Sequence, residues 1–156
     1  YGFSRFAQDF KDAGFSGLII ADFPWEARHF EKEMEGYLSR VLLASVTSSP
    51  ARIKQIARES EGFVYLVSGK GTTGQVEMEE ERLREVVELI KEVSSSLVLI
   101  GFGVNSPEKA QKLAQIADGV IIGSALLQVI IQEERSPQRG FRRLLSSYCQ
   151  ALDKTS

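Results

Sequence analysis

The chain has 156 residues, of which 43% are hydrophobic and 26% charged, and its formal net charge is −2. This length suits a single domain over residues 1–156, and the composition is that of an ordinary folded protein. The small negative charge gives no electrostatic footprint for nucleic acid, and no apolar stretch approaches the roughly 20 residues that cross a bilayer, so neither is an expected partner.

The single cysteine, Cys149, has no second thiol with which to form a disulfide or a metal site. The expected compartment is therefore reducing and cytoplasmic. The sequence begins at Tyr1 instead of a methionine, and we expect a processed chain or a fragment.

Helices and strands alternate from the amino end. Apolar residues at helical spacing predict a helix that begins near Phe3 and ends at Gly14, and the apolar run at residues 17–21 predicts the first strand. A second amphipathic pattern predicts a helix over residues 27–38, and the next buried strand is predicted at residues 41–45.

The alternation continues to the carboxyl end. Ser49 with Pro50, and Ser106 with Pro107, form two helix-start signals. In chain order the remaining elements are predicted as a helix from residue 49, strand 63–67, helix 83–93, strand 97–100, helix 106–113, strand 119–122, helix 124–132 and a final helix through residues 141–152.

Five short, uniformly apolar strands separated by amphipathic helices indicate a parallel α/β sheet. A doubly wound sheet would carry a glycine-rich fingerprint after its first strand, and the segment "IIADFPWEA" has none. We therefore predict a parallel (β/α) TIM barrel, present in this chain as about five strands with a carboxyl-terminal helix.

Three glycine-bearing turns each follow a predicted strand, at residues 71–74, 101–103 and 123–124. In a parallel sheet they leave at the same carboxyl-end edge, where backbone N–H groups can approach an anion with no Cβ in the way. Glycines also make tight turns for purely structural reasons, so for any one turn the two explanations compete. Three converging turns favour a phosphate site, and the helix that opens at Ser124 would add its positive dipole end.

Other reactive side chains have structural explanations as well. Lys70 could form an imine with a carbonyl substrate, but between two glycines we expect a solvated cation. Asp22 follows the first strand, where barrel enzymes place catalytic groups, although organising its own loop is the favoured role. Tyr65 could bond substrate or fill the core, and the sequence leaves both open. His29 is interpreted as structural or exposed.

Four segments taken together, "GLIIADFP", "GFVYLVSGKGTTG", "IGFGVNSPEKA" and "ADGVIIGSALL", closely resemble the α subunit of tryptophan synthase from its fourth strand to its end. The resemblance implies an eight-stranded TIM barrel and a lyase of tryptophan biosynthesis. That enzyme cleaves indole-3-glycerol phosphate to indole and glyceraldehyde 3-phosphate by a retro-aldol step, without metal or organic cofactor. Its implied partner is a β subunit, which uses pyridoxal phosphate and receives the indole. The implied location is the cytoplasm, or the plastid stroma for a plant chain.

Carried over to this sequence, the resemblance implies roles for particular residues. Tyr65 matches a strand tyrosine near the catalytic base, and Thr73 matches the threonine of a loop that closes over substrate. Gly69 and Ala21 stand where arginine and proline are common in the family. The implied substrate-binding positions are Gly74, Gly103, Gly123 and Ser124 for the phosphate and Phe102 for the wall of the indole pocket.

A larger departure concerns the acid and the base. The family uses a glutamate on its second strand and an aspartate in the following loop, and neither has a counterpart in this sequence. Asp22 is the only carboxylate at the carboxyl end of a predicted strand, and Asp118 precedes its strand. We therefore expect this chain to carry the phosphate-binding half and to be inactive alone.

Two alternatives remain for the function. One is a non-catalytic module that binds phosphate or activates a β subunit. The other is a different phosphate-binding barrel isomerase or aldolase, with Lys70 as an imine-forming residue. Open sheet edges and an uncovered apolar face also predict self-association of the chain.

Overall fold

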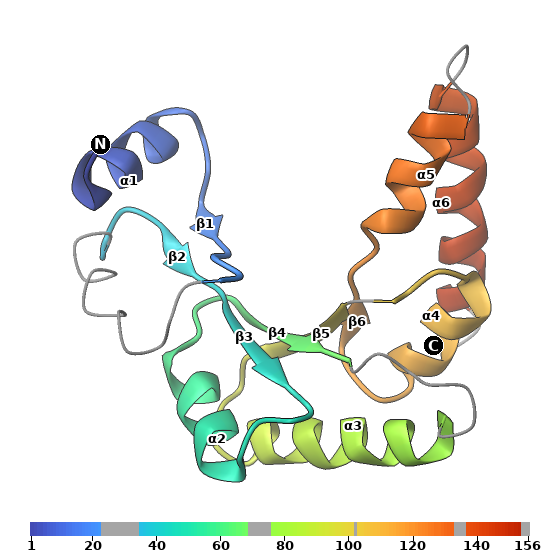
Figure 1. Ribbon diagram of the computed structural model, residues 1–156, viewed down its shortest axis with the longest axis horizontal. Coiled ribbons are helices and arrows are strands. Elements are labelled where there is room, and N and C mark those ends of the chain that lie inside the picture. The colour runs from blue at the N-terminus through green and yellow to red at the C-terminus, as the bar shows by residue number, and fades with distance from the viewer. Residues whose placement is uncertain (23–34, 69–75, 102, 133–136, 154–156) are drawn as a thin grey trace.

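The computed structural model describes residues 1–22, 35–68, 76–101, 103–132 and 137–153, and within them helices and parallel strands alternate (Figure 1). Strands β3, β4, β5 and β6 form one parallel sheet in that order, and β1 pairs with β2, also in parallel. The predicted parallel α/β class is confirmed. The elements are α1 (Phe3–Asp12), β1 (Gly17–Leu18), β2 (Ser39–Arg40), β3 (Leu42–Ser45), α2 (Pro50–Glu59), β4 (Phe63–Val67), α3 (Val76–Lys91), β5 (Leu97–Gly101), α4 (Pro107–Ala114), β6 (Gly119–Val120), α5 (Ser124–Gln132) and α6 (Pro137–Asp153).

The two sheets are continuous through a single segment of chain. Only Val41 separates β2 from β3, and its N–H donates to the carbonyl of Leu18 at 3.0 Å. The predicted strand 41–45 is therefore part of a longer extended segment, residues 39–45. Its first part, β2, pairs with β1, and its second part, β3, pairs with β4.

Several predicted boundaries were wrong. The helix predicted at residues 83–93 begins at Val76 and ends at Lys91. The strand predicted at residues 17–21 ends at Leu18. The last described backbone hydrogen bond that pairs it with the neighbouring segment runs from the Val41 N–H to the Leu18 carbonyl. The strand predicted at residues 119–122 ends at Val120. Of the predicted helix 27–38, residues 23–34 lie outside the described residues, and Leu38 lies in a bend, buried in the apolar cluster beneath α1.

Both predicted helix-start signals are confirmed by capping geometry. The Ser49 hydroxyl accepts from the Arg52 amide at 3.3 Å, and the Ser106 hydroxyl accepts from the Lys109 amide at 3.2 Å. Each cap satisfies a helix N–H that would otherwise lack a partner, which stabilises a helix by about 1 kcal/mol. Gly14, beyond the end of α1, has φ +90°, a conformation that suits glycine and ends the helix where predicted.

The main core lies between one face of the sheet and the helices α2 and α3, which both cover that face (Figure 1). Side chains alternate along each strand, so every second residue of β4 and β5 points at these helices. The residues that meet there are Ala44, Val64, Leu66, Val98 and Ile100 from the strands, with Ile53, Ile56 and Ala57 from α2 and Leu83, Val86, Val87 and Ile90 from α3.

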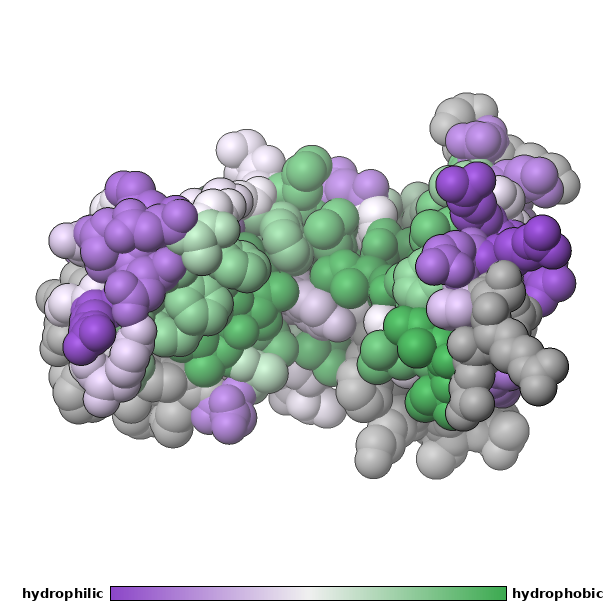
Figure 2. Space-filling view, turned by 90° about the horizontal axis from the view of Figure 1, so that it is seen from above, coloured by the Kyte–Doolittle hydropathy of each residue, from purple (hydrophilic) through white to green (hydrophobic). Residues whose placement is uncertain are grey.

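The opposite face of the sheet is apolar but only partly covered. Phe63, Tyr65 and Val67 of β4 lie on this face, and all three are half-buried, whereas their neighbours Val64 and Leu66 are buried. Figure 2 looks onto this side and shows apolar surface across its middle, between two polar ends. Burial therefore alternates along β4, between a buried face and a face that is only partly covered. In a complete barrel this second face would be the interior, covered by further strands.

Candidate functional site

The carboxyl ends of β4, β5 and β6 lie side by side, because the three strands are neighbours in register. Val67 pairs with Gly101, and Ile100 pairs with Val120. The turns that follow β5 and β6 therefore leave from the same end of the sheet, where β4 also ends. The turn after β4, with Thr73 and Gly74, and the residue Phe102 lie outside the described residues.

Gly103 occupies a backbone conformation that favours glycine. Its φ is +72°, in the left-handed region, and the residue is exposed just beyond the end of β5. Among the described residues, a Cβ built at this position would have one neighbour within 4 Å, the ammonium nitrogen of Lys109, at 3.4 Å. The turn thus exposes its backbone beside a positive charge, which is an arrangement that suits an anion.

Gly123 and Ser124 form the amino end of α5. The Gly123 carbonyl accepts from the amides of Leu126 and Leu127 at 3.0 and 3.2 Å, so the helix begins here. Both Gly123 and Ser124 are exposed, and no described residue lies within 4 Å of a Cβ built on Gly123. Since the first amides of a helix have no intrahelical acceptor, this end offers donors and open space to an anion.

The turn at Gly103 is supported from behind by α6. The next residue, Val104, is buried, and its carbonyl accepts a long hydrogen bond of 3.5 Å from the buried hydroxyl of Tyr148. Burial, and then the negative charge of Glu108, raise the pKa of Tyr148, so its hydroxyl stays protonated and remains a donor. This contact fixes the helix α6 against the loop that carries Gly103.

Tyr65 lies across the end of the neighbouring strand, a contact that the sequence did not predict. A Cβ built on Gly101 would lie 2.1 Å from the Tyr65 hydroxyl oxygen and 2.3 Å from its Cζ. The register explains the contact, because Gly101 pairs with Val67, two residues beyond Tyr65, so both point to the same face. Gly101 is needed to make room for the phenol, in addition to its place in the turn.

Ser68 is a second residue that sequence reasoning missed. It is 2% exposed, its N–H donates to the Gly101 carbonyl at 3.3 Å, and its hydroxyl lies 3.4 Å from the same oxygen. These bonds extend the β4 to β5 pairing to the last residue before the glycine-rich turn. A serine between a strand and a glycine run is the only signal that could have indicated it.

The remaining candidates are not brought to this edge by any described contact. Asp22 lies exposed in a turn after β1, and Cys149 is an exposed free thiol on α6. His29 and Lys70 lie outside the described residues. Across the part of the chain that the structure describes, no cluster of side chains suits a metal ion, and no helix is long and apolar enough to cross a membrane.

Comparison with known proteins decides the family. A family model described as "Tryptophan synthase alpha chain" matches residues 1–156. The chain belongs to this family. The resemblance seen in the sequence is thereby confirmed, and with it the assignment to a family of lyases of tryptophan biosynthesis.

Individual members of the family support the same assignment. The tryptophan synthase alpha chain of Oceanobacillus iheyensis is 39% identical over 137 residues, which are 85% of this chain and 51% of that protein. That of Arabidopsis thaliana is 36% identical over 146 residues, 92% of this chain and 53% of that protein. The crystal structure of tryptophan synthase subunit alpha from Legionella pneumophila str. Paris is 32% identical, with a TM-score of 0.82 over 99% of this chain and 58% of that chain.

These comparisons confirm the TIM-barrel class for the parallel strands. They also fix the extent of the match, because the chain spans about half the length of the curated relatives that it matches.

Proposed function

We propose that this chain supplies the phosphate-binding half of a tryptophan synthase alpha barrel, which cleaves indole-3-glycerol phosphate to indole and glyceraldehyde 3-phosphate. The observation that carries the proposal is that two exposed glycine turns follow adjacent parallel strands, β5 and β6. Gly103, with φ +72°, follows β5, and Gly123 with Ser124 opens α5 after β6. Backbone amides at such turns bind a phosphate oxygen at little steric cost.

The other assigned residues complete the proposed site. Tyr65 lies on the partly covered face of β4, where a substrate inside a barrel would contact its phenol. Thr73 and Gly74 belong to the loop proposed to close over the substrate, and Phe102 is proposed to line the indole. No cofactor is assigned. The proposed partner is a tryptophan synthase β subunit, and the proposed location is the cytoplasm, or the plastid stroma in a plant.

Indole release from indole-3-glycerol phosphate tests the proposed division of labour. We expect none from this chain alone, because the resemblance assigns no residue of this sequence to the family's glutamate or aspartate. Release is expected when the amino-terminal half of a family barrel is supplied and the two parts fold together. Indole release by this chain alone, above that of Gly123→Asp, would contradict the absence of an acid and a base. A well-folded reconstituted barrel without any cleavage would contradict the proposed reaction.

Binding of glyceraldehyde 3-phosphate tests the phosphate site directly. We expect the chain to bind it, and Gly123→Asp to weaken the affinity by about tenfold or more, because the new carboxylate would face the phosphate charge. Titration calorimetry measures both constants. Equal affinity of the two chains would show that the phosphate binds elsewhere.

We also propose that the isolated chain associates with itself. Large apolar side chains lie in water at Leu127 and Ile131 of α5, which are 61% and 73% exposed, and at Leu97 of β5, which is 52% exposed. Together with the apolar middle of the surface in Figure 2, they leave apolar surface that a second copy of the chain could cover. Light scattering during size exclusion is expected to give a mass above that of one chain. A single monomeric species at high concentration would refute this.

A further inference from the structure

Lys109 places a positive charge at the glycine turn after β5. It lies in the first turn of α4, where its backbone N–H bonds to the capping hydroxyl of Ser106. Helical side chains lean toward the amino end of their helix, and this one reaches back as far as Gly103. Its ammonium nitrogen lies 3.4 Å from the point that a Cβ on Gly103 would occupy.

The charge of Lys109 is not engaged by another described side chain. Within the residues that the structure describes, the ion pairs of lysine ammonium groups join Lys54 to Glu92 and Lys91 to Asp118, each at 2.6 Å. Lys109 takes part in no such pair. Its half-buried side chain is held beside the turn, and the ammonium remains available to an anion from outside.

The local helix energetics do not explain this lysine. A cation in the first turn of a helix is disfavoured by the dipole, whose amino end is positive. The negative charge that interacts favourably with this end of the dipole is the carboxylate of the neighbouring Glu108. Hydrogen bonds from its own backbone amide and from Ser106 lower the pKa of Glu108, so its carboxylate stays ionised in solvent. A bound anion at Gly103 would account for the cation, because it would lie between the ammonium and the exposed backbone of the turn.

We propose that Lys109 is a ligand of the substrate phosphate, contacting it from the α4 side while the turn at Gly103 and the amino end of α5 contact it through backbone amides. The inference rests on the function proposed above. A lysine ammonium contributes a full charge and three donors, so it binds a phosphate dianion more strongly than backbone amides alone. Lys109 thereby favours dianionic phosphate esters over substrates without that charge.

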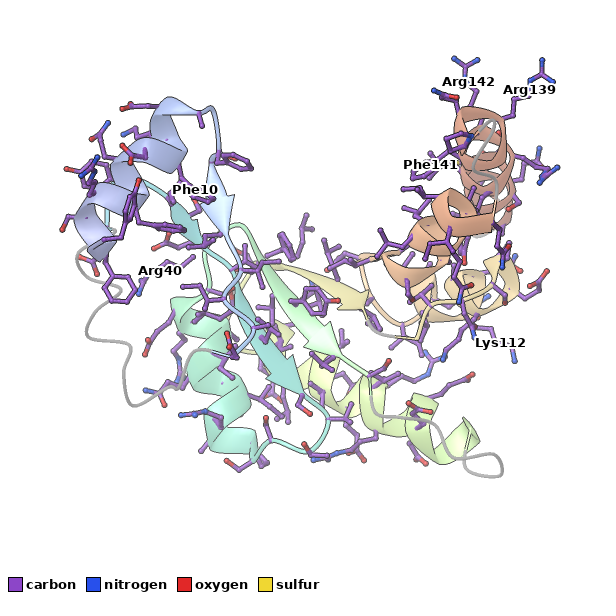
Figure 3. All side chains as sticks on the ribbon, turned by 45° about the horizontal axis from the view of Figure 1, so that its top comes forward. Phe10, Arg40, Lys112, Arg139, Phe141 and Arg142 are labelled. Carbon is purple, nitrogen blue, oxygen red and sulfur yellow. The ribbon has the colours of Figure 1, made fainter. Side chains whose placement is uncertain are left out.

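The test compares neutral variants of Lys109 with a matched lysine on the same helix. Lys109→Gln and Lys109→Met both remove the charge and keep the backbone amide that donates to the capping hydroxyl of Ser106. Lys109→Met also keeps most of the aliphatic stem. Lys109→Arg restores a cation. Lys112→Gln is the control, because Lys112 is exposed and projects outward from α4 in Figure 3. The probes are inorganic phosphate and glyceraldehyde 3-phosphate, titrated by calorimetry at low and at high salt.

We expect both neutral variants to bind each probe about tenfold more weakly at low salt, which corresponds to the loss of one charge-assisted hydrogen bond. The difference should shrink at high salt, because ions screen an exposed charge pair. Lys109→Arg should retain most of the affinity, and Lys112→Gln should match the unchanged chain.

The outcomes separate this inference from the function on which it rests. If the neutral variants bind both probes as well as the unchanged chain does, while Gly123→Asp loses binding, the role of Lys109 is refuted and the phosphate site stands. If the unchanged chain binds neither probe, both the site and the role of Lys109 are refuted. Equal losses in Lys112→Gln and in the Lys109 variants would also refute the specific role, because they would reflect net charge alone.

Discussion

Replacing Gly101 with alanine is expected to displace the Tyr65 ring and to lower the free energy of unfolding by about 1–3 kcal/mol, the usual cost of overpacking. The new Cβ would lie 2.1 Å from the Tyr65 hydroxyl oxygen, 2.3 Å from Cζ and 2.6 Å from Cε1. Because two ring carbons lie inside the contact limit with the hydroxyl oxygen, a small rotation of the hydroxyl cannot relieve the clash. The ring has to leave the end of β5, and we expect its tyrosine fluorescence or NMR signals to shift.

A matched glycine and a double-mutant cycle isolate this contact. Gly123→Ala places a Cβ where no described residue lies within 4 Å, so its unfolding midpoint in urea should match that of the unchanged chain. In a Tyr65→Ala background, Gly101→Ala should cost much less, because the atoms that it meets are gone. If Gly101→Ala costs the same with and without the Tyr65 ring, the clash is not the source of the destabilisation.

The fold could be predicted to a large extent because its signals are local. Each predicted strand is a short apolar run, and Ser49 and Ser106 begin their helices through hydroxyl bonds to amides three residues later. The boundaries failed where pairing decides them. Leu18 ends β1 because its carbonyl accepts the last described bond from Val41, and nothing in the apolar run at residues 17–21 contains that information.

The candidate site could be predicted only in part, for the same reason. Gly103 could be identified because a turn with a positive φ strongly favours glycine, which is visible in the sequence. The second role of Gly101 depends on the register between β4 and β5, which sets Tyr65 two residues before its cross-strand partner. The reach of Lys109 depends on where α4 packs relative to the turn. Contacts between elements are set by tertiary structure, so a single sequence does not reveal them.

Asp118 is a carboxylate whose contacts give it a structural role. It precedes β6, at the end of the sheet opposite to the glycine turns, and there it makes two hydrogen bonds to the backbone of Val98. Its N–H donates to the Val98 carbonyl at 3.0 Å, and its Oδ2 accepts from the Val98 N–H at 2.7 Å. The Lys91 ammonium donates to the same Oδ2 at 2.6 Å, so Asp118 joins the end of α3 to the starts of β5 and β6.

Replacing Asp118 with alanine should therefore lower the free energy of unfolding by about 1–3 kcal/mol at pH 7, since the N–H of the buried Val98 loses its acceptor. Glu92→Ala is the matched control. It removes a lysine ion pair of the same 2.6 Å length, to Lys54, but among the described residues no backbone N–H donates to the Glu92 carboxylate. Exposed pairs of this kind contribute about 0–1 kcal/mol. Asp118→Asn should cost less than Asp118→Ala, because an amide oxygen can still accept from Val98.

The pH dependence distinguishes the ionised carboxylate from mere packing. Burial raises the pKa of Asp118, but hydrogen bonds from Lys91 and the Val98 amide outweigh it and hold the pKa below its ordinary value. A pKa that is lower in the folded state gives a stabilisation that is complete above the unfolded value, about 3.9, and is lost as the pH falls through the folded value. The difference in unfolding free energy between the unchanged chain and Asp118→Ala should thus be constant from pH 7 to pH 5 and shrink below pH 4. A difference that stays the same down to pH 3 would mean that the charge of Asp118 contributes nothing, and that the loss at pH 7 comes from the side-chain volume alone.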